Sequence, residues 1–325
     1  MKTRYGTFNG FVDKNGVKTW LGIPFAQPPV KKLRWQAPQP LKPSNKSFGA
    51  KKFGFTAVQD VDKTEGASVN PQSEDCLTLN IWRRGDKKNL PVMVWIHGGG
   101  FVSGGSSDPL YNGSNFAAAN DTVIVTINYL LNVFGFFNLA SVDSAFSDSG
   151  YLGTKDQVAA LTWVKENIAE FGGNPDNVTI FGESAGAVST MLLMVIPAAK
   201  NLFQKSISQS GHTHTYNIPE KSAQFTEIEQ RIYSALGKIF CSKSPNHGAE
   251  LERLRLPQRF EHSKLERTAL RLRKLKFNRT LHLGKCRGNF LCRRNFLKKN
   301  IDLTKSLLIK SAQMFERGGT FCLIT

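Results

Sequence analysis

The alternation of hydrophobic and polar positions predicts a sheet of buried strands separated by helices. Short apolar runs, each bounded by glycine, asparagine or proline, read CLTLNIW (76–82), PVMVWIHGGG (91–100), TVIVTINY (122–129) and NVTIFGES (177–184). Runs this short and this rich in valine and isoleucine are typical of strands buried on both faces of a largely parallel sheet. A further strand is predicted in FQKSISQSG (203–211).

Two helices are predicted among these strands. The first lies in TKDQVAALTWVKENIAEFGG (154–173), with a capping-box pattern from Thr154 to Gln157 at its start and two glycines at its end. The second, AGAVSTMLLMVI (185–196), ends before Pro197. Because strands alternate with helices, the pattern favours an open, wound α/β sheet with flanking helices.

The start of the chain predicts a hairpin. The stretches YGTFNGFV (5–12) and VKTWLGIPF (17–25) alternate in polarity on either side of Asn15-Gly16, a dipeptide that favours a tight turn. After about Gln224 the pattern degrades, and strand, turn and capping signals become few. The chain is therefore divided into residues 1–224, the N-terminal part of an α/β domain, and residues 225–325, a divergent segment.

Composition adds limits on compartment and cofactors. A hydrophobic content of 40% over 325 residues is enough for a sizeable core. No stretch approaches the roughly 18 consecutive apolar residues of a membrane span, and the start MKTRYGTFNGF lacks the apolar region of a signal peptide. Five cysteines without zinc-type spacing, and without an export signal, favour a reducing, cytoplasmic compartment. No metal or cofactor is expected.

The first candidate for chemistry is Ser184. It stands in FGESAGA at G-x-S-x-G spacing, between a predicted strand and a predicted helix. In a nucleophile elbow, such a tight turn exposes the serine Oγ at the carboxyl edge of a sheet, and the glycines let strand and helix approach closely. The alternative is that Ser184 is only the N-cap of the following helix.

A second motif favours the catalytic alternative. WIHGGGF (95–101) ends a predicted strand with three glycines, and acyl transfer needs free N–H groups that stabilise an oxyanion. Gly99 and Gly100 are the expected donors, with Ala185 as the third, and His97 is expected to hold the loop. A phosphate-binding loop would require a lysine followed by serine or threonine after the glycines, and none is present.

With these motifs the chain resembles the type-B carboxylesterases, a family that includes bacterial para-nitrobenzyl esterases, animal carboxylesterases and cholinesterases. The resemblance runs from about Arg4 to about Gly211, on LGIPFAQPPVKKLRW, SEDCLTLNIW, VMVWIHGGGF, NYLLNVFGFF, GYLGTKDQVAALTWVKENIAEFGGNPDNVTIFGESAGA and LFQKSISQSG. It implies an α/β-hydrolase fold, with Ser184 as nucleophile. Secreted relatives pair the cysteine of EDCL with an upstream cysteine; here Cys76 has none before it, and a small buried side chain is expected instead.

The triad base and acid are less apparent. The order in this fold is serine, acid, histidine, and the resemblance implies an acid in a DEG-like motif that this chain lacks. His247 is the candidate base, because NHGAEL matches the HG-x-E context of the family's histidine. It follows Ser184 by only 63 positions, so either a segment has been lost or the match is accidental. The other candidate histidines and acids are His212, His214, His262, His282, Glu220, Glu227, Glu229 and Asp302.

The final quarter of the chain carries most of the net charge of +18. Residues 251–325 hold 19 basic and 5 acidic side chains, a net charge of +14. A nucleic-acid-binding patch is one interpretation, but no binding module or regular aromatic spacing accompanies the charge. The favoured interpretation is a frameshift or deletion that replaced the second half of the family's sequence with a poorly ordered tail, which leaves the C-terminal part of the fold incomplete.

The sequence therefore predicts a serine esterase that acts on small carboxylic esters through an acyl-enzyme, impaired if the triad acid and base are lost. The alternatives are an inactive esterase-like binding protein and a truncated gene product. No nucleic-acid partner is expected, and the oligomeric state is not predicted.

Overall fold

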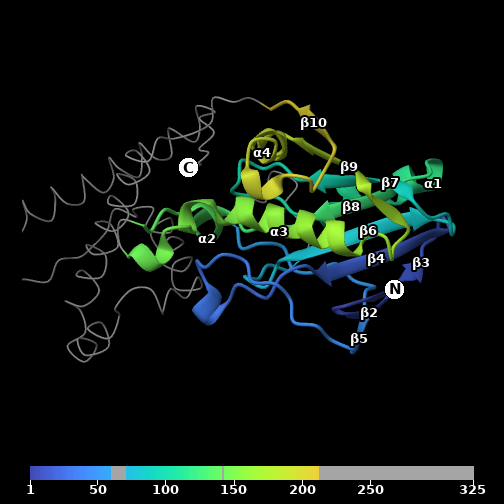
Figure 1. The fold of residues 1–325 in the computed structure, drawn as a ribbon, viewed down its shortest axis with the longest axis horizontal. Helices are drawn as coiled ribbons and strands as arrows, with labels where there is room; N and C mark the ends of the chain where they lie inside the picture. The colour runs from blue at the N-terminus through green and yellow to red at the C-terminus, as the bar shows by residue number, and fades with distance from the viewer. Residues whose placement is uncertain (60–70, 141–142, 212–325) are drawn as a thin grey trace, which may run out of the picture. The chain divides into compact units, whose positions relative to one another are not determined.

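The structure, a computed structural model, describes residues 1–59, 71–140 and 143–211. Within these residues a central sheet has seven strands in the order β10-β9-β7-β8-β6-β4-β3 (Figure 1). Its strands are β3 (Phe11–Val12), β4 (Val17–Pro24), β6 (Thr78–Arg84), β7 (Leu90–Ile96), β8 (Val123–Ile127), β9 (Gly173–Glu183) and β10 (Lys205–Gln209). A smaller sheet joins β1 (Lys2–Thr3), β2 (Gly6–Asn9) and β5 (Ser47–Gly49).

The central sheet is parallel over the half that carries the predicted chemistry. Strands β8, β7, β9 and β10 are parallel neighbours, in register from Val92 opposite Val123 to Gln209 opposite Glu183. Strand β6 was predicted among the parallel strands but runs antiparallel to β8. Only residues 85–89 join β6 to β7, and this turn is too short for the crossover that parallel strands require. The chain therefore reverses direction there.

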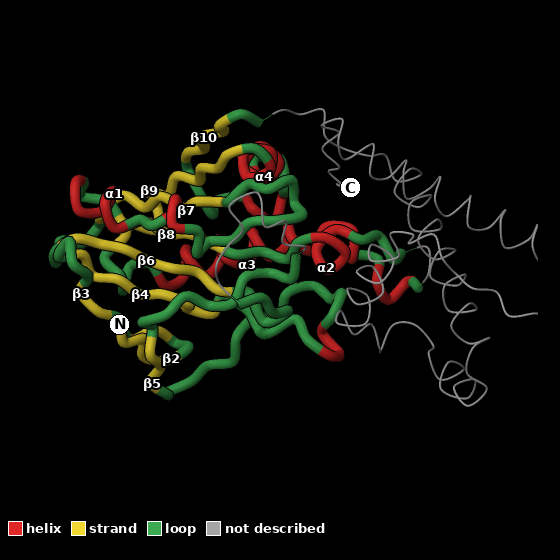
Figure 2. The backbone as a smooth tube through the Cα atoms, turned by 180° about the vertical axis from the view of Figure 1, so that it is seen from behind, coloured by secondary structure: helices red, strands yellow, loops and turns green. Residues whose placement is uncertain are grey.

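Helices cover both faces of the sheet. Figures 1 and 2 show α3 (Leu152–Asn167) and α4 (Ala185–Leu193) on one face. The helix α1 (Ser114–Ala119) packs against β4, β6 and β8. In β7 every second residue is fully buried, namely Val92, Val94 and Ile96, whereas Met93 and Trp95 between them are half-buried. The alternation shows that one face of β7 is fully buried and the other only partly.

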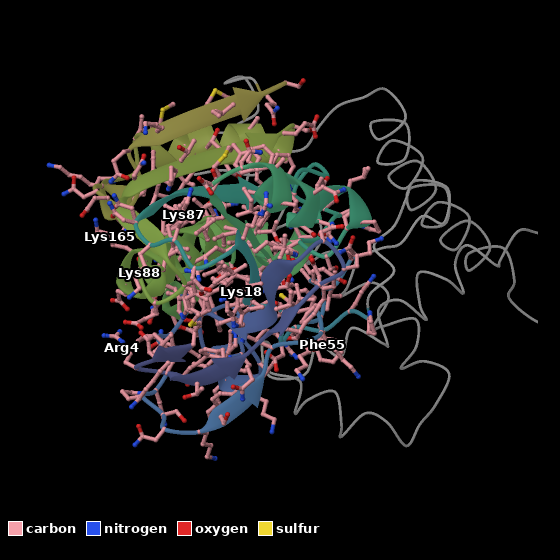
Figure 3. All side chains as sticks on the ribbon, turned by 90° about the vertical axis from the view of Figure 1, so that its right-hand side faces the viewer. Arg4, Lys18, Phe55, Lys87, Lys88 and Lys165 are labelled. Atoms are coloured by element: carbon pink, nitrogen blue, oxygen red, sulfur yellow. The ribbon has the colours of Figure 1, made fainter. Side chains whose placement is uncertain are left out.

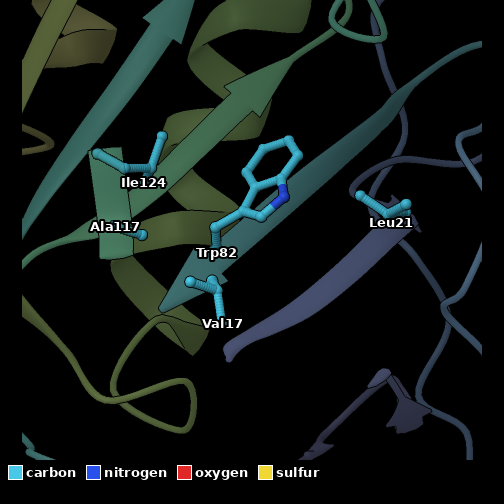
Figure 4. Packing of buried hydrophobic residues seen from close by; sticks show 5 residues of the cluster. All are labelled: Val17, Leu21, Trp82, Ala117 and Ile124. Carbon is cyan, nitrogen blue, oxygen red and sulfur yellow. The ribbon is translucent and has the colours of Figure 1, made fainter. Parts of the chain in front are cut away.

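The contact between α1 and the sheet forms a core cluster, shown in Figure 4. Trp82 of β6 lies at its centre with 1% of its surface exposed, beside Ile124 of β8 and Ala117 of α1. Val17 and Leu21 of β4 complete it. Burying an aliphatic or aromatic side chain contributes about 1.5–3 kcal/mol to the free energy of unfolding, so this cluster fixes α1 and the β4–β6 pair firmly.

Both predicted helices exist, with changed ends. The helix α3 begins at Leu152, so Thr154 lies inside it and the predicted capping box is wrong. A 3-10 helix, Ser149–Tyr151, leads directly into α3 and removes the need for a cap there. The helix α4 begins at Ala185, as predicted, and ends at Leu193, earlier than predicted. Further short helices are α2 (Asn132–Phe136), and the 3-10 helices Lys31–Leu33, Pro109–Tyr111, Ser144–Phe146 and Pro197–Ala199.

The predicted hairpin is correct in part. Phe11 and Val12 pair antiparallel with β4, and the Asp13 N–H donates to the carbonyl of Val17 at 2.9 Å to close the turn. The earlier residues of the first stretch form β2, which belongs to the smaller sheet. Only the end of the stretch therefore contributes to the hairpin.

Some basic side chains on this part of the chain form ion pairs. Figure 3 labels Lys18, Lys87 and Lys165, which form ion pairs with Asp86, Asp121 and Asp176 respectively. Such exposed pairs stabilise little, about 0–1 kcal/mol each. In the described part of the chain no helix has both the length and the apolar character needed to cross a membrane.

Candidate active site

The predicted site residues gather at the carboxyl edge of the parallel strands. Strand β7 leads into the loop His97–Gly104, here called the oxyanion loop, and β9 leads into Ser184. The two are adjacent, since a Cβ placed on Gly98 would lie 3.3 Å from the Cβ of Ser184. Ligands of open α/β sheets bind at this edge. The topology thus brings together two motifs that lie more than 80 positions apart in sequence.

Ser184 has a strained backbone, with φ 54° and ψ −119°. Its N–H donates to the carbonyl of Gln209 at the end of β10, at 3.0 Å, which fixes the turn from the neighbouring strand. Ser184 is the N-cap residue of α4, but its side chain makes no capping hydrogen bond to the helix. Backbone strain of this kind costs about 1–3 kcal/mol and persists where the surrounding structure enforces it. The half-buried hydroxyl has no hydrogen-bond partner among the described residues.

The glycines around Ser184 are required by close packing. A Cβ on Gly186 would lie 2.0 Å from the carbonyl oxygen of Ile96, and one on Gly182 would lie 2.5 Å from the carbonyl carbon of Gly186. Strand β9, helix α4 and the end of β7 therefore meet backbone to backbone at this point. The prediction that strand and helix nearly touch here is confirmed.

The oxyanion loop is a tight turn closed on itself. Gly99 and Gly100 have positive φ values of 98° and 61°, and Phe101 continues with 61°. The carbonyl of Gly99 accepts hydrogen bonds from the N–H groups of Val102 and Ser103, both at 3.0 Å. Within the described residues the N–H groups of Gly99 and Gly100 donate to no acceptor. They are available to a ligand.

Ala185 supplies the third expected N–H group. It is the first residue of α4 and is 3% exposed. The first N–H groups of a helix have no partner within the helix and carry the positive end of its dipole. An anionic oxygen beside Ser184 would therefore be favoured at this helix N-terminus.

His97 is buried within the oxyanion loop. Its Nδ1 lies 2.8 Å from the carbonyl oxygen of Gly98, and burial lowers its pKa to about 4. The imidazole is therefore neutral at pH 7, and Nδ1 donates to Gly98. The ring stacks on Tyr129 with 4.4 Å between ring centres. These contacts agree with the predicted role of His97 in holding the loop.

Two further side chains contact this loop but carried no sequence signal. The Gln59 amide binds the backbone of Gly104, and the Asn132 amide donates to the carbonyl of Val102. Both belong to segments that resemble loops in sequence. Nothing in their local pattern indicated the contact, because it joins positions separated by 30 to 45 residues.

Two buried titratable groups lie near one another behind this edge. Asp156 of α3 is 1% exposed, and burial raises its pKa to about 7. One carboxylate oxygen accepts the Leu130 N–H at 3.0 Å, and the other has no partner among the described residues. Cys76 is a free, fully buried thiol whose pKa is raised by burial and then by Asp156. The expectation that Cys76 is a small buried side chain is confirmed.

The candidate base and acids lie outside the described residues. This applies to His247 and to every other histidine and acid proposed from the sequence: His212, His214, His262, His282, Glu220, Glu227, Glu229 and Asp302. Among residues 1–59, 71–140 and 143–211, no cluster of three potential metal ligands occurs.

The fold, with Ser184 on the tight turn between β9 and α4, defines the class of the α/β-hydrolases. Residues 1–251 match the family model described as the carboxylesterase family. The chain therefore belongs to the carboxylesterase family, whose members are serine hydrolases.

Individual relatives agree with this assignment. The para-nitrobenzyl esterase of Bacillus subtilis (strain 168) is 49% identical over 232 residues, which are 70% of this chain and 47% of that protein. The acetylcholinesterase of Danio rerio is 42% identical over 251 residues, 73% of this chain and 38% of its own. The chain spans less than half the length of these relatives.

Two solved esterase structures also match this chain, which covers a little less than half of each of them. A thermophilic PNB esterase superposes with a TM-score of 0.67 at 45% identity, covering 72% of this chain and 48% of its own. The carboxylesterase of Geobacillus stearothermophilus superposes with a TM-score of 0.65 at 47% identity, covering 70% and 46%. The α/β-hydrolase fold predicted from the sequence is confirmed.

Proposed function

We propose that this chain hydrolyses small carboxylic esters, with Ser184 as the nucleophile. The observation that supports this most strongly is the strained Ser184 backbone beside two loop N–H groups that have no acceptor among the described residues. A serine hydroxyl close to N–H donors that have no acceptor of their own is what acyl transfer needs. The family membership and the para-nitrobenzyl esterase relative support the same substrate class.

In the proposed mechanism, the Ser184 Oγ attacks the ester carbonyl while a histidine takes its proton. The carbonyl oxygen becomes an oxyanion that accepts hydrogen bonds from the N–H groups of Gly99, Gly100 and Ala185. The alcohol then leaves with the proton from the histidine, and an acyl group remains on Ser184. Water, activated by the same histidine, attacks the acyl-enzyme and releases the acid.

We propose His247 as this histidine. Its HG-x-E context supports the assignment, and its position only 63 residues after Ser184 is unusual for a fold of this kind. The variant His247→Ala should abolish turnover while leaving the amount of folded protein unchanged. Turnover at the wild-type rate would remove His247 from the mechanism.

A second candidate function is an inactive esterase-like binding protein, which could also be a truncated gene product. The chain covers less than half of the relatives' length, and a DEG-like acid motif is absent from the sequence. For the active esterase and for the inactive protein alike, we propose a cytoplasmic location, small esters as ligands, and no binding of nucleic acid.

The test uses the full chain with p-nitrophenyl acetate. We expect hydrolysis that Ser184→Ala abolishes and that Ser208→Ala, a nearby β10 serine bonded to the carbonyl of Ala187, leaves intact. A fluorophosphonate probe should label Ser184, located by mass spectrometry of the peptide. Hydrolysis that survives Ser184→Ala would sink the nucleophile assignment, and failure of both hydrolysis and labelling would favour the inactive alternative.

A further inference from the structure

We infer that Gln59 and Asn132 are positioning residues that hold the oxyanion loop against Ser184 at two points. This inference rests on the proposed function in one respect, namely that the N–H groups of Gly99 and Gly100 are the oxyanion donors. The restraint of the loop itself is inferred only from the hydrogen bonds and packing contacts of Gln59 and Asn132.

Gln59 clamps the base of the loop with both ends of its amide. Its Oε1 accepts the Gly104 N–H at 2.8 Å, and its Nε2 donates to the Gly104 carbonyl at 2.8 Å. The same Nε2 donates to the carbonyl of Ala57 at 3.0 Å, and the Gln59 N–H donates to Oε1 of Gln72 at 3.0 Å. Because Gln59 is only 4% exposed, water cannot easily replace these bonds.

Gly104 transmits this restraint to the start of the loop. With φ at 103°, it packs so closely that an added Cβ would lie 2.7 Å from Nδ1 of His97 and 2.9 Å from the carbonyl oxygen of Gly98. Gly98 in turn adjoins the Cβ of Ser184. Moving Gly104 would therefore shift the donors relative to the nucleophile, since the packed backbones leave no room for independent movement.

Asn132 binds the middle of the loop. Its N–H donates to the carbonyl of Phe101 at 3.0 Å, and its Nδ2 donates to that of Val102 at 2.7 Å. The Nδ2 also lies 3.3 Å from the carbonyl of Val58, the residue before Gln59. Asn132 has φ 54°, a conformation that asparagine tolerates better than most residues. Gln59 and Asn132 therefore both bind the oxyanion loop, and Asn132 also contacts the residue next to Gln59.

This pairing matters for chemistry because oxyanion donors act by being fixed in advance. Removal of one donor in such a site costs about 10²–10³ in kcat. If all the donors remain but the loop moves more freely, the loss in kcat should be smaller than this. The KM for the ester should stay unchanged. A loss of general stability would instead lower the amount of active enzyme.

The first experiment does not depend on activity. Hydrogen–deuterium exchange of the full chain is followed in peptides that span residues 97–105, for the wild type and for Gln59→Met and Asn132→Gly. Asn132→Gly keeps the positive φ and the bond from the backbone N–H, and removes only the side-chain amide. We expect at least tenfold faster exchange in the loop for both variants, and unchanged exchange in α3.

Matched variants separate a local effect from general damage. Gln204→Met removes another glutamine that binds backbone, the Val178 N–H at 2.7 Å, and should leave loop exchange as in the wild type. Gln59→Glu keeps the acceptor for the Gly104 N–H but sets a buried carboxylate oxygen against the carbonyls of Gly104 and Ala57. Its loop should therefore exchange at least as fast as that of Gln59→Met. If Gln59→Met does not fold, Gln59→Glu and Asn132→Gly carry the test. Wild-type loop exchange in the folded variants would overturn the inference.

The second experiment measures p-nitrophenyl ester hydrolysis by the same proteins. We expect kcat to fall about tenfold in Gln59→Met and in Asn132→Gly with KM unchanged, and no change in Gln204→Met. If the wild type has no activity, the proposed function fails while the exchange result still decides the positioning inference. If the wild type is active and loop exchange rises without a fall in kcat, the catalytic half of the inference is wrong.

Discussion

The hydroxyl of Tyr129 donates a hydrogen bond to the carbonyl oxygen of His97 at 2.8 Å, while the two rings stack. Tyr129 follows β8 and His97 follows β7, so this bond joins the carboxyl ends of two neighbouring parallel strands. The bond links the oxyanion loop to the end of β8, and both side chains are buried.

The variant Tyr129→Phe tests this bond. It keeps the ring and its stacking and leaves the buried His97 carbonyl without the hydroxyl donor. An unsatisfied buried acceptor costs about 1–3 kcal/mol, so the free energy of unfolding should fall by about that amount. Urea denaturation measures the change, with Tyr151→Phe, whose hydroxyl is half-exposed and bonded to Asp148, as the control. An unchanged free energy of unfolding would show that the bond contributes nothing net.

The backbone packing at the elbow makes a separate prediction. In Gly186→Ala the new Cβ would meet the carbonyl oxygen of Ile96 at 2.0 Å, a distance that requires α4 or β7 to move. Overpacking of this kind costs about 1–3 kcal/mol or more, and we expect a lower yield of folded protein. Gly49→Ala is the matched control, because nothing lies within 4 Å of its Cβ position. Equal yield and equal thermal midpoint in the two variants would contradict the packing.

The ion pair between Arg34 and Glu74 makes a third prediction. The guanidinium binds both carboxylate oxygens, at 2.5 and 2.6 Å, with each side chain exposed by less than a fifth. Bidentate geometry in a partly buried place stabilises more than an exposed pair. Glu74→Gln should therefore lower the free energy of unfolding by about 1–2 kcal/mol, and Asp121→Asn, at the exposed pair with Lys87, by less than 0.5 kcal/mol. A double-mutant cycle with Arg34→Met isolates the coupling, and a coupling no larger than that of the exposed pair would refute it.

The sequence predicted the parts of the fold that depend on local pattern. Runs of valine and isoleucine marked β7, β8 and β9, and the glycines at Gly182 and Gly186 marked a close approach that the structure contains. Strand direction was less accessible, since the reversal at β6 depends on the length of a turn and on which strands become neighbours. The helix start at Leu152 was missed because a preceding 3-10 turn replaced the expected cap.

The candidate site could likewise be predicted only in part from the sequence. The positions of Ser184, Gly99, Gly100 and Ala185 could be predicted, because each motif encodes its own turn. The contacts made by Gln59 could not, because a glutamine that binds a glycine 45 positions away leaves no mark in either local sequence. Long-range hydrogen bonds to backbone carry no residue-type signature at the acceptor.

The buried carboxyl of Asp156 gives the last prediction, a pH dependence of stability. Burial raises its pKa from 3.8 to about 7, so the folded state binds this proton more tightly than the unfolded state does. The contribution of Asp156 to the free energy of unfolding should then fall as the pH rises from about 4 to about 7, and its full cost, roughly 4 kcal/mol, remains above pH 7. Asp156→Asn removes the titration and can still accept the Leu130 N–H. The free energy of unfolding of this variant should gain on that of the wild type as the pH rises across this range, and should exceed it at pH 8. The lowered pKa of buried His97 adds an opposing slope that is the same in both proteins, so the difference between them isolates Asp156.

Urea denaturation at several pH values between 4 and 8 measures this difference. Asp121→Asn, at an exposed ion pair, should retain the wild-type pH dependence and serves as the control. The neighbouring Cys76 thiol is fully buried with its pKa raised, so it stays neutral throughout this range and adds no slope. If Asp156→Asn and the wild type differ by the same amount at pH 4 and pH 8, the carboxyl is not neutral in the folded protein. The Leu130 contact would then be made by a buried anion at every pH tested.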